Sequence, residues 1–228
     1  MLPVLSEEVV RHRIARRIAM EFEDGDVVNL GIGIPTLVSD HIPEGVRVIF
    51  QTENGVVGAG PKPPEDDLRF IGAGGRCLSV IPGGALIASD FSFGLIRGGH
   101  LDATVLGALQ VDQEGNLANW WIPGKLVPGM GGAMDLVTGA KHVIVATTHT
   151  TKKGQPKLVK KCSLPLTGAK VVSLVVTEYA LFRFVDGQMV LEEIAPGVTE
   201  EDLKGVTEAE YVTSSNLSIM KGCDEEQN

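Results

Sequence analysis

The sequence predicts an α/β fold, with a single domain, a mostly parallel sheet, flanking helices and an antiparallel hairpin at one edge. Short apolar runs rich in β-branched residues alternate with helical patterns through the first two-thirds of the chain. Several glycine-rich loops directly follow the expected strands. Near the end, Asp186-Gly187 separates two apolar runs, and this dipeptide is favoured in tight hairpin turns.

The first half of the chain begins with a helix over residues 6–22. Ser6 is a suitable N-cap, and apolar residues recur at helical spacing as far as Phe22. Four arginines on its other faces are expected to be solvated. The elements that follow are strands over 27–30, 46–50 and 77–81, a helix over 35–41 that starts at a proline, and a helix over 89–96 that starts at a serine.

The second half of the chain is dominated by apolar runs. We expect a central strand over 101–111, further strands over 143–147, 171–185 and 189–194, and helices that start near Asp135 and Thr199. Thr199 and Asp202 are spaced as in a capping box. The predicted domain covers residues 1–218, and residues 219–228 form a polar C-terminal tail.

Composition narrows the class of protein. The chain has 228 residues, which is enough for one domain with its own core. Its net charge of −9 argues against a nucleic-acid partner, because such a partner requires a basic face. An anionic small ligand stays compatible, since a few local cations outweigh a distant net charge.

Localisation is predicted from the cysteines and the apolar runs. Three separated cysteines without a Cys-x-x-Cys pair indicate a reduced, cytoplasmic protein. No apolar run reaches the ~18 residues of a membrane span, and the acidic start does not resemble a signal peptide. We therefore expect no contact with a membrane.

Glu53 is the first candidate for chemistry. It follows the expected strand over 46–50, and ligands of open α/β sheets bind outside the carboxyl ends of the strands. Gly55, Gly58 and Gly60 come next, and glycine allows the backbone to approach a ligand closely. Glu53 is thus placed as a nucleophile or a general base, with a solvated loop carboxylate as the alternative.

Two glycine loops accompany this carboxylate. Gly31 and Gly33 lie between a strand and a helix start, a geometry that can cradle a phosphate, although Thr36 stands where a dinucleotide motif has its last glycine. The glycines before Asp135 also leave backbone N–H groups bare at a helix start. The histidines show no His-x-x-x-His pair, so no metal site is expected. No Gly-x-Ser-x-Gly nucleophile elbow occurs either.

A series of motifs resembles a known family. The chain is similar, from about residue 6 to 213, to the β subunit, or C-terminal half, of the family I 3-oxoacid CoA-transferases. The matching segments are Asn29-Leu30-Gly31-Ile32-Gly33-Ile34-Pro35, Glu53-Asn54-Gly55, Ile96-Arg97-Gly98-Gly99-His100, Leu117-Ala118-Asn119-Trp120, Ile122-Pro123-Gly124-Lys125, Gly129-Met130-Gly131-Gly132-Ala133-Met134-Asp135-Leu136 and Leu164-Pro165-Leu166-Thr167-Gly168. The resemblance implies a CoA-transferase fold, which is like that of ribose-phosphate isomerase.

The resemblance also implies a mechanism. Glu53 would attack an acyl-CoA to give a mixed anhydride, and the CoA thiolate would return to form a glutamyl-CoA thioester, so that kinetics are ping-pong. Backbone N–H groups of Gly131, Gly132 and Ala133 would stabilise the oxyanions. Asn29 and Asn54 would orient Glu53.

Five further residues are candidates for contacts with CoA or the substrate by this resemblance: Gly31, Gly33, Arg76, Arg97 and Lys125. One position departs from the family pattern. Relatives commonly have a lysine after a Gly-Ala-Gly turn, where this chain has Gly75 followed by Arg76. Either Arg76 replaces the cationic contact, or the substrate preference differs.

Partners follow from the same resemblance. The family needs an α subunit of similar fold, so a hetero-oligomer is expected, with α2β2 as one compatible arrangement, and Trp120 and Trp121 are expected at the contact. The expected substrates are an acyl-CoA and a carboxylic acid, with no cofactor beyond the substrate coenzyme A. Two alternatives stay open: a phosphosugar isomerase or deaminase with Glu53 as general base, and a non-enzymatic ligand-binding or regulatory subunit.

Overall fold

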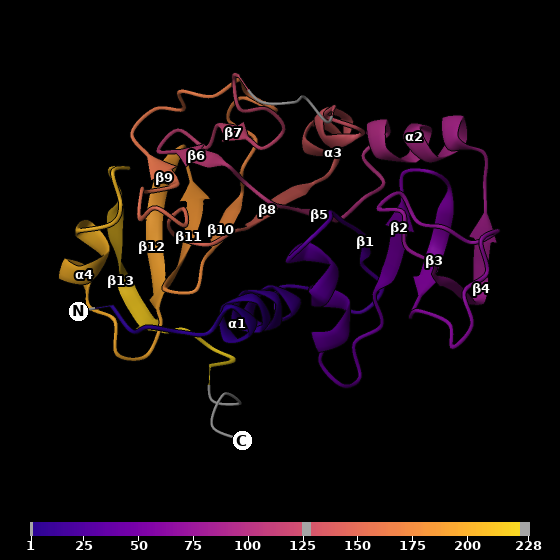
Figure 1. Ribbon diagram of the computed structural model, residues 1–228, viewed down its shortest axis with the longest axis horizontal. Coiled ribbons are helices and arrows are strands. Elements are labelled where there is room, and N and C mark those ends of the chain that lie inside the picture. The colour runs from indigo at the N-terminus through magenta and orange to yellow at the C-terminus, as the bar shows by residue number, and fades with distance from the viewer. Residues whose placement is uncertain (1, 125–128, 224–228) are drawn as a thin grey trace.

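The computed structural model describes residues 2–124 and 129–223. Its elements are α1 (Glu7–Ala19), β1 (Val27–Leu30), the 3₁₀ helix η1 (Pro35–His41), β2 (Ile49–Thr52), β3 (Val56–Gly60), β4 (Ser79–Leu86), α2 (Ser89–Arg97), β5 (Ala103–Leu106), β6 (Gln110–Asp112), β7 (Leu117–Ala118), α3 (Ala133–Gly139), β8 (His142–Ala146), β9 (Leu158–Val159), β10 (Leu174–Val176), β11 (Ala180–Val185), β12 (Gln188–Ile194), α4 (Glu200–Lys204) and β13 (Val212–Ile219). Figure 1 shows how they are arranged.

A ten-stranded sheet with a parallel centre forms the body of the protein. Its strand order is β13-β12-β11-β10-β8-β5-β1-β2-β3-β4. The five central strands, from β10 to β2, are all parallel, and antiparallel pairs flank them on both sides. The predicted fold class is confirmed. The second antiparallel group, β2-β3-β4, is not among the sequence predictions.

The predicted hairpin turn is present between β11 and β12. Asp186 has a φ of 51° and Gly187 a φ of 78°. Positive φ at both central residues is what a type I′ turn requires, and this turn matches the right-handed twist of the paired strands. The Asp-Gly dipeptide therefore fixes the register of the hairpin, in which Val185 pairs with Gln188.

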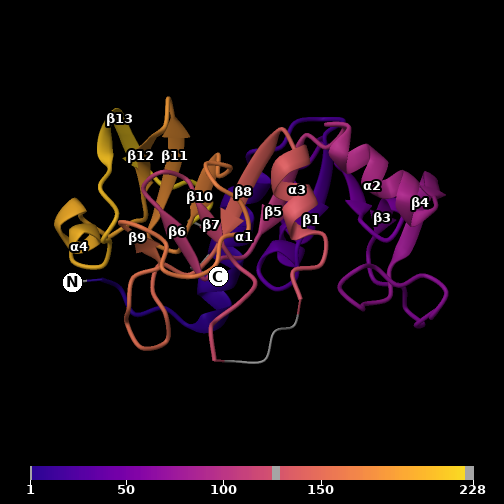
Figure 2. The ribbon, with the colours of Figure 1, turned by 90° about the horizontal axis from the view of Figure 1, so that it is seen from above.

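Helices pack on the central strands. The hydroxyl of Ser6 accepts the N–H of Val9, which confirms the predicted N-cap of α1, although α1 ends at Ala19 rather than Phe22. α1 packs against β8 and β10. α2 and α3 lie side by side, as Figure 1 and Figure 2 both show. Within the described residues, no helix is long and apolar enough to cross a membrane.

The expectation that all arginines of α1 are solvated is wrong. Arg13 and Arg17 are buried. Arg17 contacts Glu193 of β12 and Glu21, both at 2.7 Å. Burial alone would lower the pKa of Arg17, but the two carboxylates outweigh it and the pKa is raised. The buried ion pair of Arg17 with Glu193 ties α1 to β12, a link that charge patterning along one helix does not reveal.

Two apolar runs that the sequence predicts as single strands are each divided. The run 101–111 contains β5 in the large sheet and β6 in a separate three-stranded sheet of order β7-β6-β9. The run 171–185 contains β10 and β11, which turn at Thr177. Hydrophobicity does not mark either break, because the strands on both sides of it are buried.

Other boundaries shift by a few residues. β2 begins at Ile49 rather than Val46, because Val46 belongs to a turn in which its N–H donates to Pro43. β4 runs from Ser79 to Leu86 and includes Pro82, which an edge strand tolerates. At the C-terminus, Met220 and Cys223 are buried. The division at residue 218 stays a prediction.

A buried histidine makes the fold sensitive to acid. The ring of His149 is fully buried and lies 2.9 Å from the hydroxyl of Thr177 and 2.8 Å from that of Thr207. Burial lowers the pKa of His149 to about 4. Since the unfolded chain binds this proton near its ordinary pKa of about 6.5, stability is complete above that pH and falls as the pH drops towards 4.

We therefore expect His149 to lower the free energy of unfolding by about 2 kcal/mol between pH 7 and pH 5. Urea unfolding at both pH values measures this change. The His149→Gln variant should be less stable at pH 7 but lose less stability on acidification, whereas the exposed control His100→Gln should follow wild type. Equal acid losses for His149→Gln and wild type would contradict the prediction.

Candidate active site

The site lies where the central parallel strands end. In the register of the sheet, Asn29 of β1 pairs with Gln51 of β2, so Gly31 and Glu53 both follow directly on their strands. The N–H of Gly31 donates to Val105 of β5 at 2.8 Å. A Cβ on Gly31 would lie only 3.0 Å from that same carbonyl oxygen. A glycine is needed there for the loop to pass so close to β5.

Glu53 is held by Asn29 and flanked by the second glycine loop. The carboxylate Oε2 accepts the side-chain N–H of Asn29 at 3.2 Å, and Glu53 is half-buried. A Cβ on Gly132 would lie 3.4 Å from Cγ of Glu53. The structure thus brings together Glu53, Asn29 and the glycine turn, three features that are distant in the sequence. This arrangement provides a carboxylate with adjacent backbone donors.

The expected oxyanion donors are not equivalent. The N–H of Ala133 donates to the carbonyl of Met130 at 3.2 Å. Among the described residues, the N–H groups of Gly131 and Gly132 have no backbone acceptor. Gly131 has a φ of 54°, a conformation that glycine adopts without strain. Of the three N–H groups, those of Gly131 and Gly132 are therefore the ones left without a backbone acceptor among the described residues, and their role as oxyanion donors stays a prediction.

Asn54 is hydrogen-bonded away from Glu53. Its side-chain N–H donates to the carbonyl of Ile71 at 2.7 Å, and its oxygen accepts the hydroxyl of Thr52 at 2.6 Å. Neither contact is with Glu53, and the role of Asn54 in orienting Glu53 stays a prediction. Asn54 instead fastens the loop of Glu53 to the segment 61–78, which we call the flap.

The flap contacts the first glycine loop. A Cβ on Gly74 would be 3.3 Å from the side chain of Ile32, which stands between Gly31 and Gly33. Gly33 has a φ of 95°, and its carbonyl accepts the hydroxyl of Thr36 at 2.7 Å. Gly31, Gly33 and the turn before Arg76 are thus neighbours, and Arg76 itself is exposed.

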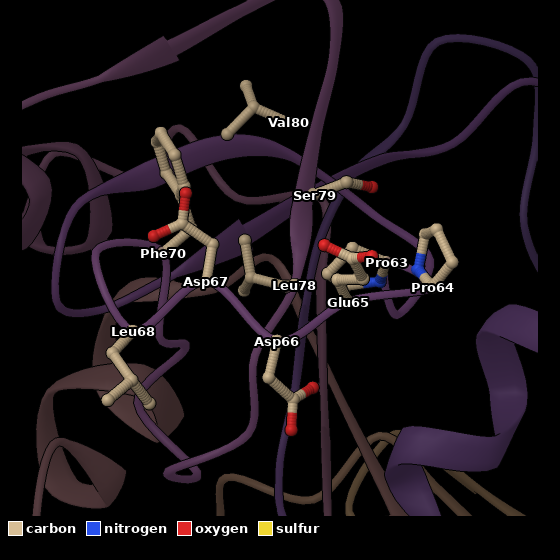
Figure 3. A pocket seen from close by; sticks show the side chains of 10 residues that line it. All are labelled: Pro63, Pro64, Glu65, Asp66, Asp67, Leu68, Phe70, Leu78, Ser79 and Val80. Atoms are coloured by element: carbon tan, nitrogen blue, oxygen red, sulfur yellow. The ribbon is translucent and has the colours of Figure 1, made fainter.

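A cavity of about 760 Å³ is formed by the flap itself and the first residues of β4 (Figure 3). Its lining combines three carboxylates with apolar side chains and one hydroxyl. The carboxylates are Glu65, Asp66 and Asp67, and the other residues are Pro63, Pro64, Leu68, Phe70, Leu78, Ser79 and Val80. Asp66 and Asp67 are ion-paired with Lys62 and Arg69, so cations and carboxylates alternate around this cavity and do not form a site for an anion alone. The candidate carboxylate Glu53 lies outside it.

The predicted cationic contacts are only partly in place. Arg97 donates to Asp135 at 2.7 Å and its guanidinium lies 5.5 Å from the ring centre of Phe93. Phe93 in turn lies against Gly132, so Arg97 stands near the glycine turn. Arg97 is 65% exposed and can still receive an anion. Lys125 lies outside the described residues.

The two tryptophans are half-buried neighbours. Their ring centres are 5.6 Å apart, and the indole N–H of Trp120 donates to Leu166 at 3.3 Å. The indole nitrogen of Trp121 is buried without a hydrogen-bond partner among the described residues. Their expected place in a contact with the partner chain stays a prediction.

Sequence reasoning missed two buried polar residues behind Glu53. Gln51 lies two residues before Glu53 on β2, and Ser92 lies on α2. Both are almost fully buried and hydrogen-bonded to each other. A polar residue at the end of an apolar strand is the signal that could have identified Gln51. Nothing in the helical pattern of α2 distinguishes Ser92.

The chain shares a family-wide sequence pattern with known proteins. The sequence pattern described as "Coenzyme A transferase" matches residues 11–205. The chain belongs to the coenzyme A transferase family. The match covers most of the described chain, including Glu53 and both glycine loops.

Individual members of this family are also similar over nearly the whole chain. The beta chain of the acetate CoA-transferase of Haemophilus influenzae is 54% identical, over 91% of this chain and 94% of its own length. One chain of the probable succinyl-CoA:3-ketoacid coenzyme A transferase of Bacillus subtilis is 49% identical, over 91% and 97%. The crystal structure of the acyl-CoA transferase apoenzyme of Escherichia coli O157:H7 has a TM-score of 0.73 at 24% identity. The structural match covers 96% of this chain and 45% of the acyl-CoA transferase chain.

Proposed function

We propose that this chain is the β subunit of a CoA-transferase that moves CoA between an acyl-CoA and a 3-oxoacid or short-chain carboxylate. The observation that carries the proposal is the placement of Glu53. Its carboxylate follows β2 at the carboxyl edge of the sheet, accepts an N–H of Asn29 and adjoins Gly132. The names of the similar proteins, acetate CoA-transferase and succinyl-CoA:3-ketoacid coenzyme A transferase, support the substrate class.

In the first half of the proposed reaction, Glu53 forms a bond from its carboxylate oxygen to the thioester carbon of an acyl-CoA. The carbonyl oxygen becomes an oxyanion, which the N–H groups of Gly131 and Gly132 can stabilise. One such donor typically lowers the barrier by roughly 3 kcal/mol. The bond from carbon to sulfur then breaks, and the products are a mixed anhydride on Glu53 and the CoA thiolate.

In the next step the thiolate attacks the Glu53 side of the anhydride. The acyl group leaves as a carboxylate, and CoA remains bound to Glu53 as a glutamyl-CoA thioester. An acceptor acid then repeats the two steps in reverse and leaves as its CoA ester. Because the first product departs before the acceptor enters, the kinetics are ping-pong.

The proposal includes a partner. The similar proteins of Haemophilus influenzae and Bacillus subtilis are each named as one subunit of their enzyme, which supports an α subunit that completes the site here. The glycine loops, the flap and Glu53 form one wall of the site, and the α subunit would close the other. The donor and acceptor acids follow from the family only as a class, with succinate, acetate, butyrate and acetoacetate all compatible.

The isomerase or deaminase alternative uses Glu53 as a general base. The same edge of the sheet would serve it, so geometry alone does not separate the two mechanisms. The similarity to named CoA-transferases favours covalent transfer. A regulatory subunit without catalysis is disfavoured by the same similarity.

Trapping the covalent intermediate tests the proposal. Incubation of the two-subunit enzyme with acyl-CoA and no acceptor should leave CoA on Glu53. Borohydride reduces a thioester but not a carboxylate, so the side chain should become an alcohol, with one oxygen lost and two hydrogens gained. Peptide mass spectrometry should find this change on the peptide that contains Glu53, and activity should be lost.

The control omits acyl-CoA and should retain both activity and the unmodified peptide. Reduction of Glu44 or Glu65 to the alcohol, instead of Glu53, would show that the nucleophile is misassigned. Normal turnover without any modified residue would contradict the covalent mechanism and favour the general-base mechanism.

A further inference from the structure

A chain of hydrogen bonds lies behind Glu53 and is closed off from solvent. The amide of Asn29 donates to Glu53 at 3.2 Å and to the side-chain oxygen of Gln51 at 3.0 Å. The amide N–H of Gln51 donates to the hydroxyl of Ser92 at 2.7 Å, and this hydroxyl donates to the carbonyl of Thr52 at 3.1 Å. Asn29, Gln51 and Ser92 are each 1% exposed or less.

The direction of this chain begins at Ser92. Its hydroxyl donates its single proton to the backbone carbonyl of Thr52, which also accepts the N–H of Gly55. Ser92 must then accept from its other neighbour, and Gln51 must turn its N–H group towards it. The oxygen of Gln51 consequently faces Asn29, and Asn29 presents its N–H group.

This direction matters because an amide has two unlike ends. When its N–H group faces Glu53, Asn29 donates to the carboxylate. When its oxygen faces Glu53, the amide oxygen and the carboxylate are both acceptors and repel each other. The Oδ1 atom of Asn29 is buried without a partner among the described residues, so its present orientation leaves one acceptor unsatisfied. The neighbouring groups must therefore hold the orientation.

Two groups hold it. The backbone carbonyl of Gln51 accepts from Asn29 at 3.1 Å, and the side chain of Gln51 accepts at 3.0 Å. With Glu53, the two hydrogens of the Asn29 amide face three acceptors, so one hydrogen is shared between two of them. The first contact comes from β2 itself. The contact with the Gln51 side chain depends on Ser92. Without the Ser92 hydroxyl the Gln51 amide can rotate, and its N–H group would then face the N–H group of Asn29. α2 thus reaches Glu53 through two intervening side chains.

We propose that Ser92, acting through Gln51, is a positioning residue that sets the donor direction of Asn29 and thereby holds Glu53 for attack. This inference deepens the proposed function and rests on it, since it takes Glu53 as the nucleophile. Ser92 touches neither the substrate nor the reacting atoms. Its neighbour on α2, Phe93, packs against Gly132, so one helix supports both the carboxylate and the glycine turn.

The test uses the two-subunit enzyme and variants of Ser92 and Gln51. Ser92→Ala removes the hydroxyl, and Gln51→Met removes the amide at similar volume. Both should lower kcat by about tenfold, less than the ~100-fold that loss of a direct oxyanion donor costs, while KM for acyl-CoA stays unchanged. The acid limb of the kcat/KM profile should move to higher pH, because the carboxylate loses a donor. Ser92→Thr, which keeps the hydroxyl, should restore part of the rate.

The two changes should also fail to add. Since Ser92 and Gln51 act in one chain, the double variant should be about as slow as the slower single variant. Ser89→Ala, on the exposed first turn of α2, is the matched control and should behave as wild type. Thermal unfolding of each variant shows whether a lower rate comes from loss of the folded state or from misplacement of Glu53 in a folded enzyme.

The outcomes separate this inference from the function on which it rests. If Glu53→Gln is inactive while folded Ser92→Ala and Gln51→Met keep the kcat and pH profile of Ser89→Ala, the positioning role is overturned and the proposed function stands. If Glu53→Gln is active, the proposed function fails first. A slow Ser92→Ala enzyme with a shifted acid limb, partial recovery in Ser92→Thr and non-additivity with Gln51→Met would support the inference.

Discussion

The Glu53→Gln enzyme is expected to fold like wild type and to lose CoA transfer. The amide is nearly isosteric with the carboxylate, and its oxygen can still accept the N–H of Asn29. It cannot form an anhydride with the acyl group. Because removal of a catalytic nucleophile typically costs several powers of ten, we expect kcat to fall on the order of 10⁴-fold or more.

Initial rates of the purified two-subunit complex measure this effect, with circular dichroism to show that the fold is retained. Glu44→Gln is the matched control, because it removes one negative charge from a position outside the site. It should keep wild-type turnover. Turnover near wild type in folded Glu53→Gln would contradict the assignment of Glu53.

The sequence predicts the fold class because hydrophobic periodicity and turn chemistry are local signals. The Asp186-Gly187 turn, the Ser6 cap and the strand before Glu53 can each be recognised from a few neighbouring residues. The break between β5 and β6 cannot be recognised in this way. Both strands are buried, and their placement in different sheets depends on contacts with residues distant in the sequence.

The site divides in the same way. Glu53 and the glycine loops are predictable from their place at strand ends. The contact between Asn29 and Glu53 depends on the pairing of β1 with β2. The contact between Gln51 and Ser92 depends on how α2 packs. Asn54 shows the limit of sequence adjacency. It is adjacent to Glu53 in sequence, yet its side chain holds Ile71 of the flap.

Gly55 accounts for the third residue of the Glu53-Asn54-Gly55 motif. Its φ is 113°, and its N–H donates to Thr52 at 2.9 Å, which closes the turn that carries Glu53. A Cβ at this position would lie 2.0 Å from the carbonyl oxygen of Ile87. That oxygen belongs to backbone, so the clash cannot be relieved by a side-chain rotation.

Gly55→Ala should therefore destabilise the protein by about 3 kcal/mol or more, from a strained backbone and an overpacked contact of roughly 1–3 kcal/mol each. Any variant that still folds should lose most of its CoA transfer, because the turn and Glu53 must move together. Gly25→Ala separates the two causes. Gly25 has a φ of 94° but nothing within 4 Å of an added Cβ, so it should show the strain alone. Urea unfolding measures both, and equal losses for Gly55→Ala and Gly25→Ala would show that the contact with Ile87 does not set the requirement for glycine.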